Sequence, residues 1–327
     1  MYKTITLISC PNGFGHFYRL LKLAFFLKKK KYIVNFICSD EQKNKVSNLS
    51  NLSNLSNLNF FKFYTNKNLK KNPYNFLLKF YNLDLEKYSF INKSDIIISD
   101  NLLNRIYTKK KFFLISNFLW SEFNYINKKS RNSYKKIEKT FIKKNKFIFQ
   151  NRYFNSDKKL DSLKVNFFGK SLTNNKIIRG KIFYYHSKND KIQSEYLKLL
   201  NNYEIYSNNL NLTKKFSNIK YLKTNQFHKY FNRFEFILSK PGLSTITDSI
   251  TYKIPLISFK DNDNDVELKY NLKKIVKYKI GYVLGKNKER NLIDLCDNTN
   301  YLIYKKNLKS FKFNGEEKIF EKIKSLK

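Results

Sequence analysis

A histidine that follows a glycine-containing loop near the amino terminus is the first candidate for chemistry. The segment CPNGFGHFYRLLKLAFFL carries Gly13 and Gly15 in the loop, with His16 directly after them. The amphipathic pattern then predicts a helix over Phe17–Lys30. No GK[ST] follows the glycines and Tyr18 stands at the third glycine position, so the segment is neither a P-loop nor a dinucleotide fingerprint. His16 could act as a general base at a sheet edge where ligands bind, or could merely cap the helix.

An aspartate at the end of another apolar run could assist that histidine. In SDIIISD, Asp100 comes directly after a stretch that predicts a buried strand. A carboxylate at that edge can hold the proton on one imidazole nitrogen and leave the other as an acceptor, which makes a competent general base. Asp100 could also cap a helix that begins near Leu102. The sequence therefore predicts, without showing it, that His16 and Asp100 are adjacent.

A third group, in the second half of the chain, has the pattern of an anion site. The segment FILSKPGLSTITDSITYKIPLISF predicts a strand, a Pro-Gly turn, a helix and another strand. Gly242 is expected to allow a tight start to the helix. Ser244 and Thr245 add hydroxyls to its free N–H groups, a combination suited to a diphosphate. Asp248, one turn further on, could reach a ribose hydroxyl. The alternative is ordinary capping by Ser244, with Asp248 complementing the helix dipole.

The elements that must position these groups alternate along the chain in the way typical of a parallel α/β sheet. A second helical stretch is expected over Tyr74–Asn92. The polar segment Gly169–Gly180 is the expected hinge between two halves, and the repeat SNLSNLSNLSNLN from Ser47 is expected to form a loop. The expected strands begin at Thr4, Tyr32, Phe60, Asp95, Phe112 and Lys146, and then at Lys181, Tyr203, Asn218, Phe234 and Pro255.

The net charge of +40 suggests a nucleic-acid partner, but the composition argues against one. Only seven of the 65 basic residues are arginine, which nucleic-acid readers favour for bidentate contacts. Residues with A/T-rich codons are abundant and those with G/C-rich codons are scarce, so genome composition accounts for the lysines. The charge would still attract phosphorylated ligands and an anionic membrane surface. The stretch Lys62–Phe80 could reach such a surface or be a solvated helix face.

Chain length and the number and spacing of cysteines limit the classes of protein that the sequence can represent. A chain of 327 residues is about right for two domains. No apolar run approaches the ~18–20 residues of a membrane-spanning helix, and the start MYKTITLISCPNGFGH does not fit a signal peptide, so we expect a cytoplasmic protein. Cys10, Cys38 and Cys296 are far apart and odd in number, which favours neither a disulfide framework nor a zinc site.

Four segments, in their order and spacing, resemble the nucleotide-sugar glycosyltransferases of the GT-B fold. GFGHFYR is similar to their N-terminal G-x-G-H-x-x-R loop, and SDIIISD to the strand and aspartate that follow it. SKPGLSTITDSITYKIPLISF is similar to the donor motif S-x-x-G-x-x-T-x-x-E-A-x-x-x-x-x-P. DVELKYN falls where the family carries an acidic-Gln-x-x-Asn element. More narrowly, the chain resembles the bacterial group related to the lipid-linked N-acetylglucosaminyltransferase of cell-wall synthesis and the UDP-glucuronosyltransferases.

The resemblance implies an α/β protein with two Rossmann-like parallel-sheet domains that face each other across a cleft. Residues 1–172 would form the acceptor-binding domain, and 173–327 the donor-binding domain with a C-terminal helix. In this fold the final segment, from Glu316, can cross back to the first domain. His16 matches the base that deprotonates the acceptor hydroxyl, and Asp100 matches its supporting region. The residues expected in the acceptor loop are Gly13, Gly15 and Arg19.

The same resemblance assigns the donor site. Asp248 stands where the family usually has a ribose-binding glutamate, and Glu267 matches an acidic residue that contacts donor-sugar hydroxyls. Leu268 replaces the expected glutamine, which leaves the sugar undetermined. The residues that match the diphosphate-binding turn are Gly242, Ser244 and Thr245.

The implied activity is transfer of a hexose from a nucleotide-diphosphate sugar, a UDP-sugar by resemblance, to an unidentified glycan, lipid-linked or small-molecule hydroxyl. Inversion is expected because Lys240 stands where retaining relatives carry a partner glutamate. No cofactor or metal is expected, although Asp261, Asp263 and Asp265 alternate in a polar loop. The alternatives are a nucleotide-sugar 2-epimerase of the same fold, a non-catalytic nucleotide- or polyanion-binding protein, and a nucleic-acid binder.

Overall fold

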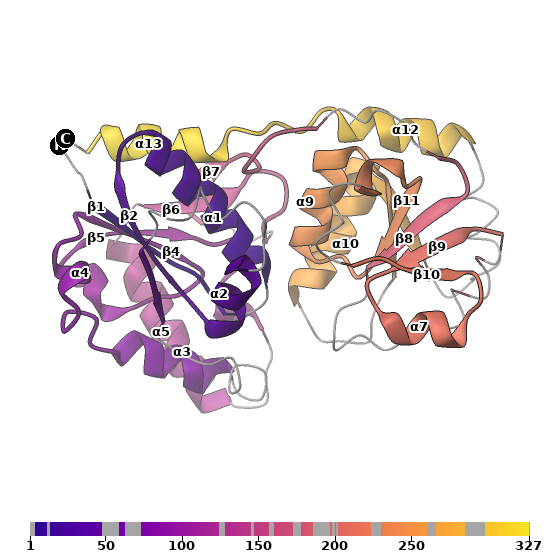
Figure 1. Ribbon diagram of the computed structural model, residues 1–327. Coiled ribbons are helices and arrows are strands. Elements are labelled where there is room, and N and C mark those ends of the chain that lie inside the picture. Colours follow the sequence, from indigo (N-terminus) through magenta and orange to yellow (C-terminus); the bar gives the residue numbers. More distant parts are fainter. Residues whose placement is uncertain are drawn as a thin grey trace. The chain divides into compact units, whose positions relative to one another are not determined.

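The structure, a computed structural model, divides the chain into two compact units, each built on one sheet (Figure 1). The first unit comprises Met1–Gly169 with Asn314–Lys327, and the second comprises Lys170–Phe313. The residues that the structure describes are 4–11, 14–47, 59–62, 73–123, 128–144, 147–156, 160–172, 178–185, 197, 200, 202–223, 230–259, 266–284 and 298–326.

The first unit contains a seven-stranded sheet in the order β3-β2-β1-β4-β5-β6-β7, and its described strand pairs are all parallel. β4 is buried along its whole length, as expected of a parallel sheet that is covered on both faces. The strands are β1 (Thr4–Ile8), β2 (Ile33–Cys38), β3 (Asn59–Lys62), β4 (Ile96–Asp100), β5 (Lys111–Ile115), β6 (Ile148–Asn151) and β7 (Leu163–Val165). The helices are α1 (Phe14–Lys29), α2 (Asp40–Ser47), α3 (Pro73–Asn82), α4 (Ser89–Asn92), α5 (Lys128–Lys144) and α13 (Gly315–Lys324), with 3₁₀ turns η3 (Arg105–Thr108) and η4 (Trp120–Glu122).

The second unit repeats the plan with a six-stranded parallel sheet in the order β10-β9-β8-β11-β12-β13. The strands are β8 (Lys181–Tyr185), β9 (Glu204–Ser207), β10 (Ile219–Tyr221), β11 (Phe236–Ser239), β12 (Leu256–Phe259) and β13 (Gly281–Leu284). The helices are α7 (Leu210–Lys215), α9 (Leu243–Tyr252), α10 (Val266–Tyr278) and α12 (Asn298–Leu308), with the 3₁₀ turn η6 (Phe231–Arg233). The expected α/β class with two parallel sheets is therefore confirmed.

Both sheets reverse their strand order beside their own first strand. β1 lies between β2 and β4, and β8 lies between β9 and β11. In open α/β sheets, ligands bind at the carboxyl ends of the strands at such a switch point. The loops after β1 and β4 in the first unit, and after β8 and β11 in the second, are therefore the places to look for a site.

The structure corrects several element assignments. β7 and β13 were not expected from the sequence, since both are short and β7 buries only Val165 of its three residues. The helical stretch expected over Tyr74–Asn92 is two helices, α3 and α4, separated by a break after Asn82. α1 begins at Phe14 rather than Phe17, so His16 lies in its first turn. The repeat that starts at Ser47 lies almost wholly outside the described residues.

The C-terminal helix belongs to the first unit, and so the assignment of all of 173–327 to the second domain is wrong for its last residues. α13 lies alongside α1 (Figure 1), and Ile319 and Ile323 are fully buried in the core of the first unit. A side chain at Gly315 would place its Cβ 2.1 Å from Phe168, so only glycine permits this close approach. Apolar burial therefore decides where the end of the chain packs.

Candidate functional site

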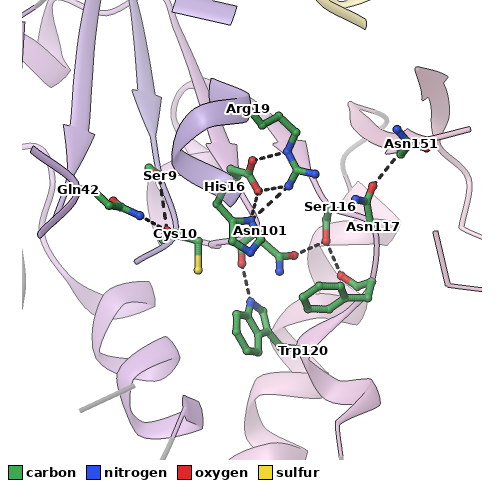
Figure 2. A network of polar contacts seen from close by, with 12 residues as sticks. Ser9, Cys10, His16, Arg19, Gln42, Asn101, Ser116, Asn117, Trp120 and Asn151 are labelled. Carbon is green, nitrogen blue, oxygen red and sulfur yellow. Dashed lines mark hydrogen bonds and ion pairs between the residues drawn. The ribbon is translucent and has the colours of Figure 1, made fainter. Parts of the chain in front are cut away.

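His16, Arg19 and Asp100 form a hydrogen-bonded cluster at the switch point of the first sheet. Figure 2 labels His16 and Arg19 of this cluster. His16 Nδ1 lies 2.7 Å from Asp100 Oδ1. Arg19 donates hydrogen bonds to both carboxylate oxygens of Asp100, with Nε 2.7 Å from Oδ2 and Nη2 2.6 Å from Oδ1. Asp100 ends β4 and has no exposed side-chain surface, whereas His16 and Arg19 keep 11% and 15% of theirs exposed. Three of the predicted residues are thus in contact, since Arg19, expected in the acceptor loop, joins His16 and Asp100.

The hydrogen bonds indicate which imidazole nitrogen carries the proton. Nδ1 of His16 also lies 3.3 Å from Nη2 of Arg19, which can only donate. An Nδ1 that donates to Asp100 cannot at the same time accept from Arg19, and the contact with Asp100 is much the shorter. We therefore assign the proton to Nδ1, which leaves Nε2 of His16 as the acceptor that a general base needs.

The charge of Asp100 is stabilised by its two partners. Burial alone would raise the pKa of this carboxyl. The positive charge of Arg19, together with the hydrogen bonds from His16 and Arg19, outweighs burial and holds the pKa below its ordinary value. Asp100 is therefore an ionised carboxylate inside the unit, and its pairing with a guanidinium is what makes such burial tolerable. The alternative role of Asp100 as a helix cap is excluded, because the next helical turn, η3, is capped by Asn104.

An asparagine after Asp100 fixes the end of β4. Asn101 has a φ of 63°, in the left-handed region that asparagine tolerates better than most residues. Its carbonyl accepts a 2.6 Å hydrogen bond from Nε1 of Trp120, and its Oδ1 accepts one from Ser116 at the end of β5. Figure 2 shows this network directly beside His16. The chain directly after Asp100 is thus held in one conformation.

A second support reaches the loop before α1. Nε2 of Gln42, from α2, donates to the carbonyl of Cys10, 2.8 Å away, and so ties down the chain where it leaves β1 (Figure 2). Gly15 lies in the first turn of α1, and Gly13 lies outside the described residues. Sequence reasoning missed Gln42, Asn101 and Trp120. Gln42 and Asn101 lie in polar runs that follow apolar strands, which was the available signal, and Trp120 has no such signal.

The start of α9 forms the second candidate region, at the switch point of the second sheet. Gly242 is the N-cap, and no side chain caps the helix among the residues that the structure describes. The first bond of the helix runs from the N–H of Ile246 to the carbonyl of Gly242, 3.0 Å away. The N–H groups before Ile246 are the ones that a helix cannot satisfy internally, and with the dipole they favour an anion. α9 has ten residues, enough for a developed dipole.

The role expected of Gly242 in the backbone is wrong. Its φ is −67° and ψ is 141°, which any residue adopts, so glycine is not needed for a tight start to the helix. A Cβ built at this position meets nothing within 4 Å. The absence of a side chain at Gly242 therefore has no structural cause in the described residues, and it leaves the approach to the helix start open.

The other expected donor residues occupy two sides of α9. Ser244 is exposed and Asp248 is half-buried one turn later, so the two share a face of the helix. Thr245 is only 7% exposed and lies toward the interior. Ser244 does not cap α9, because Gly242 precedes the helix at that place. The serine hydroxyl and the carboxylate are thus on the accessible side, and the threonine is not.

Asn271 connects α10 to this region and was not singled out from the sequence. Its buried Nδ2 donates to the carbonyl of Pro241, 2.8 Å away, directly before Gly242. Glu267 lies one turn earlier on α10 and therefore on the same side of that helix as Asn271. The available signal in the sequence was that Asn271 is the last residue of the segment DVELKYN. The structure thus brings Glu267 and the start of α9 to one end of the second unit.

No group of three or more potential metal ligands is found in the part of the chain that the structure describes, and Asp261, Asp263 and Asp265 lie outside that part. None of the described helices is long and apolar enough to cross a membrane.

Comparison with known proteins gives a likeness in structure but not in sequence. No family model matches the chain, and no curated protein is similar to it in sequence. Spinosyn forosaminyltransferase SpnP matches over 100% of this chain and 99% of its own, with a TM-score of 0.68 at 10% identity. MurG of Acinetobacter baumannii matches over 99% of both chains, with a TM-score of 0.66 at 11% identity. Spinosyn rhamnosyltransferase SpnG, complexed with thymidine diphosphate, matches over 98% of this chain and 100% of its own, with a TM-score of 0.67 at 8% identity.

These likenesses define the fold. The chain has the GT-B fold of nucleotide-sugar glycosyltransferases, as the resemblance of its four segments implied. The match extends over nearly the whole of this chain and of the compared chains, so both units are included.

Proposed function

We propose that the chain is a cytoplasmic glycosyltransferase that moves a hexose from a nucleotide-diphosphate sugar to an acceptor hydroxyl, with inversion and without a metal. The observation that carries this proposal is the 2.7 Å contact of His16 with a buried, ionised Asp100 at the switch point of the first sheet. The geometry supports a general base whose free Nε2 takes the acceptor proton as the oxygen attacks the anomeric carbon.

The donor is proposed to bind to the second unit. The start of α9 is open, because Gly242 has no side chain and Ser244 is exposed, and this supports binding of a diphosphate. The free N–H groups and the helix dipole would stabilise the negative charge of the diphosphate as it leaves the sugar. Asp248 and Glu267 are proposed to bind the ribose and the sugar hydroxyls. Thymidine diphosphate in SpnG and the UDP-sugar resemblance of the sequence give two bases to compare.

The test measures binding and transfer separately. Calorimetric titrations with UDP, TDP, ADP and GDP identify the base, and the matching nucleotide sugars are then assayed for nucleoside diphosphate release with and without candidate acceptors. Saturable binding of one nucleotide that is weakened by Ser244→Ala with Asp248→Ala supports the donor site. Nucleotide binding that His16→Ala does not change, with no release of nucleoside diphosphate from any nucleotide sugar, would indicate a nucleotide-binding protein without transferase activity.

A further inference from the structure

The exposed face of α12 in the second unit carries two adjacent apolar side chains. Tyr301 and Leu308 form the buried side of this helix. On the other side Leu302 is 62% exposed and Ile303 is 38% exposed, and no other large apolar side chain in the described ranges is as exposed as Leu302. Single exposed apolar residues are ordinary, but an adjacent pair on one helix suggests a surface that is covered by a partner.

Lysines surround this pair. Lys306 and Lys309 are exposed and follow Leu302 at spacings of four and seven, which places the three side chains on one face of the helical turn. The segment from Asn298 to Phe313 contains four lysines and no aspartate or glutamate. The positive charge of this face is therefore not balanced by acids from its own segment.

Neighbouring cations add to the charge of this face. Burial, the charge of Lys309 and the charges of Lys253 and Arg179 lower the pKa of Lys305 to about 8. Burial and the charge of Lys309 lower the pKa of Lys253 to about 8 as well. Arg179 is paired with Glu235, which is the acid of this group. Lys253, Lys305 and Lys309 thus repel one another, and a negatively charged partner would relieve that repulsion.

We propose that this face of α12, formed by Leu302, Ile303, Lys306 and Lys309, docks on an anionic lipid bilayer. The two apolar side chains would enter the boundary between head groups and acyl chains, and the lysines would lie among anionic head groups. This surface is distinct from the stretch Lys62–Phe80 that the sequence suggested for membrane contact, much of which lies outside the described residues.

The chemistry of the face favours a bilayer over other partners. A nucleic acid would use the lysines but would gain little from Leu302 and Ile303, and the face presents no arginine for bidentate phosphate contacts. A second copy of the chain would bring the same uncompensated positive charge against itself. A bilayer with anionic lipid satisfies the apolar and the basic side chains together.

Co-sedimentation with vesicles of phosphatidylcholine, with and without phosphatidylglycerol, tests the proposal on the full chain. We expect binding only to the anionic vesicles, reduced about fivefold by each of Lys306→Gln and Lys309→Gln. Leu302→Ser with Ile303→Ser should reduce it by roughly tenfold or more. Leu210→Ser is the matched control, since Leu210 is 53% exposed and precedes two lysines on α7 of the same unit. It should bind as the wild type does.

A fluorescence experiment locates the contact. The chain has one tryptophan, Trp120, which is 2% exposed and should not respond to vesicles. Leu302→Trp should show a blue shift with anionic vesicles and quenching by brominated lipid, and Leu210→Trp should show neither. Unchanged vesicle binding by the Leu302 and Ile303 double variant would overturn the proposal. So would lysine-dependent binding to heparin or RNA without binding to vesicles.

Discussion

The cluster around His16 in the first unit and the start of α9 in the second lie at corresponding places, each at the switch point of its own sheet. Their construction differs. In the first, the side chains of His16, Arg19 and Asp100 satisfy one another through contacts of 2.6 to 2.7 Å. In the second, Gly242 offers no side chain and Ser244 is exposed at the start of a helix without a side-chain cap.

This difference suggests a division of tasks. A general base must be held in one orientation and one tautomer, so its partners belong to the protein and are in place before any ligand arrives. A helix start that binds an anion gains from N–H groups that the protein leaves unsatisfied, because the ligand supplies the missing acceptors. Variants of each region should therefore affect different steps.

The largest effect is expected from His16→Ala. Loss of the base should lower kcat by roughly 10²–10⁴-fold, whereas nucleotide affinity should be unchanged because the proposed donor site lies in the other unit. Initial rates of nucleoside diphosphate release with an acceptor, together with calorimetric titration of the nucleotide, measure the two quantities. Equal losses in both would contradict the division between the regions.

Gly242→Val should produce the opposite result. A branched side chain at this open position would obstruct the ligand, so nucleotide affinity should fall about tenfold or more, which corresponds to about 1.4 kcal/mol per factor of ten. The melting temperature should not change, since a Cβ there meets nothing within 4 Å.

Gly281→Ala is the matched control for that variant. Its Cβ would lie 2.3 Å from the carbonyl oxygen of Leu256, so this substitution should lower the melting temperature. A destabilised Gly242→Val protein would show that the glycine is structural after all.

Arg19→Gln should have a smaller effect, of roughly tenfold on kcat/KM, because His16 would lose part of its positioning. It should also change the pH dependence. The charge of Arg19 is the largest cause that lowers the pKa of Asp100, so without it this pKa should rise and the acid limb of the pH–rate profile should move to higher pH.

Arg19→Lys keeps the positive charge and should restore most of the pH–rate profile. It should not restore the bidentate hydrogen bonding to the carboxylate of Asp100. An unchanged profile in Arg19→Gln, in a protein with wild-type melting behaviour, would show that Arg19 does not act through Asp100.

The smallest effect on transfer is expected from Glu138→Gln on α5, a buried carboxyl that contrasts with Asp100. Burial raises the pKa of Glu138 to about 7, and no cation is among the causes of that shift. The folded state therefore holds this proton more tightly than the unfolded state between pH 4.5 and 7, and wild-type stability should decrease as pH rises through that window. In the wild type, the free energy of unfolding should fall by up to about 3 kcal/mol over this window, and Glu138→Gln should remove that fall. Urea unfolding at several pH values measures it. A wild-type stability that rises over this window would contradict the assignment.

Much of the fold could be predicted because apolar runs and glycine-containing turns are local signals. DIIIS and FILSK were expected to be strands, and β4 and β11 occupy these segments. β7 and β13 were not predicted, since β7 buries one of its three residues and β13 begins with a glycine and buries only its two end residues, so neither is a continuous buried apolar run. The return of α13 to the first unit depends on packing against α1 and Phe168, which no local pattern encodes.

The sequence by itself determined which polar residues follow which strands, and thereby that His16 and Asp100 would lie at the same edge of a parallel sheet. Only the tertiary structure decided what these residues contact. Arg19 and Asp100 are 81 residues apart in the chain, and their pairing depends on strand order and on the direction of each side chain. Likewise, only the backbone angles and the empty space at Gly242 separate a structural glycine from one that leaves room for a ligand. The physical reason is that periodicity fixes the face on which a residue lies, whereas hydrogen bonds depend on atoms brought together by the whole fold.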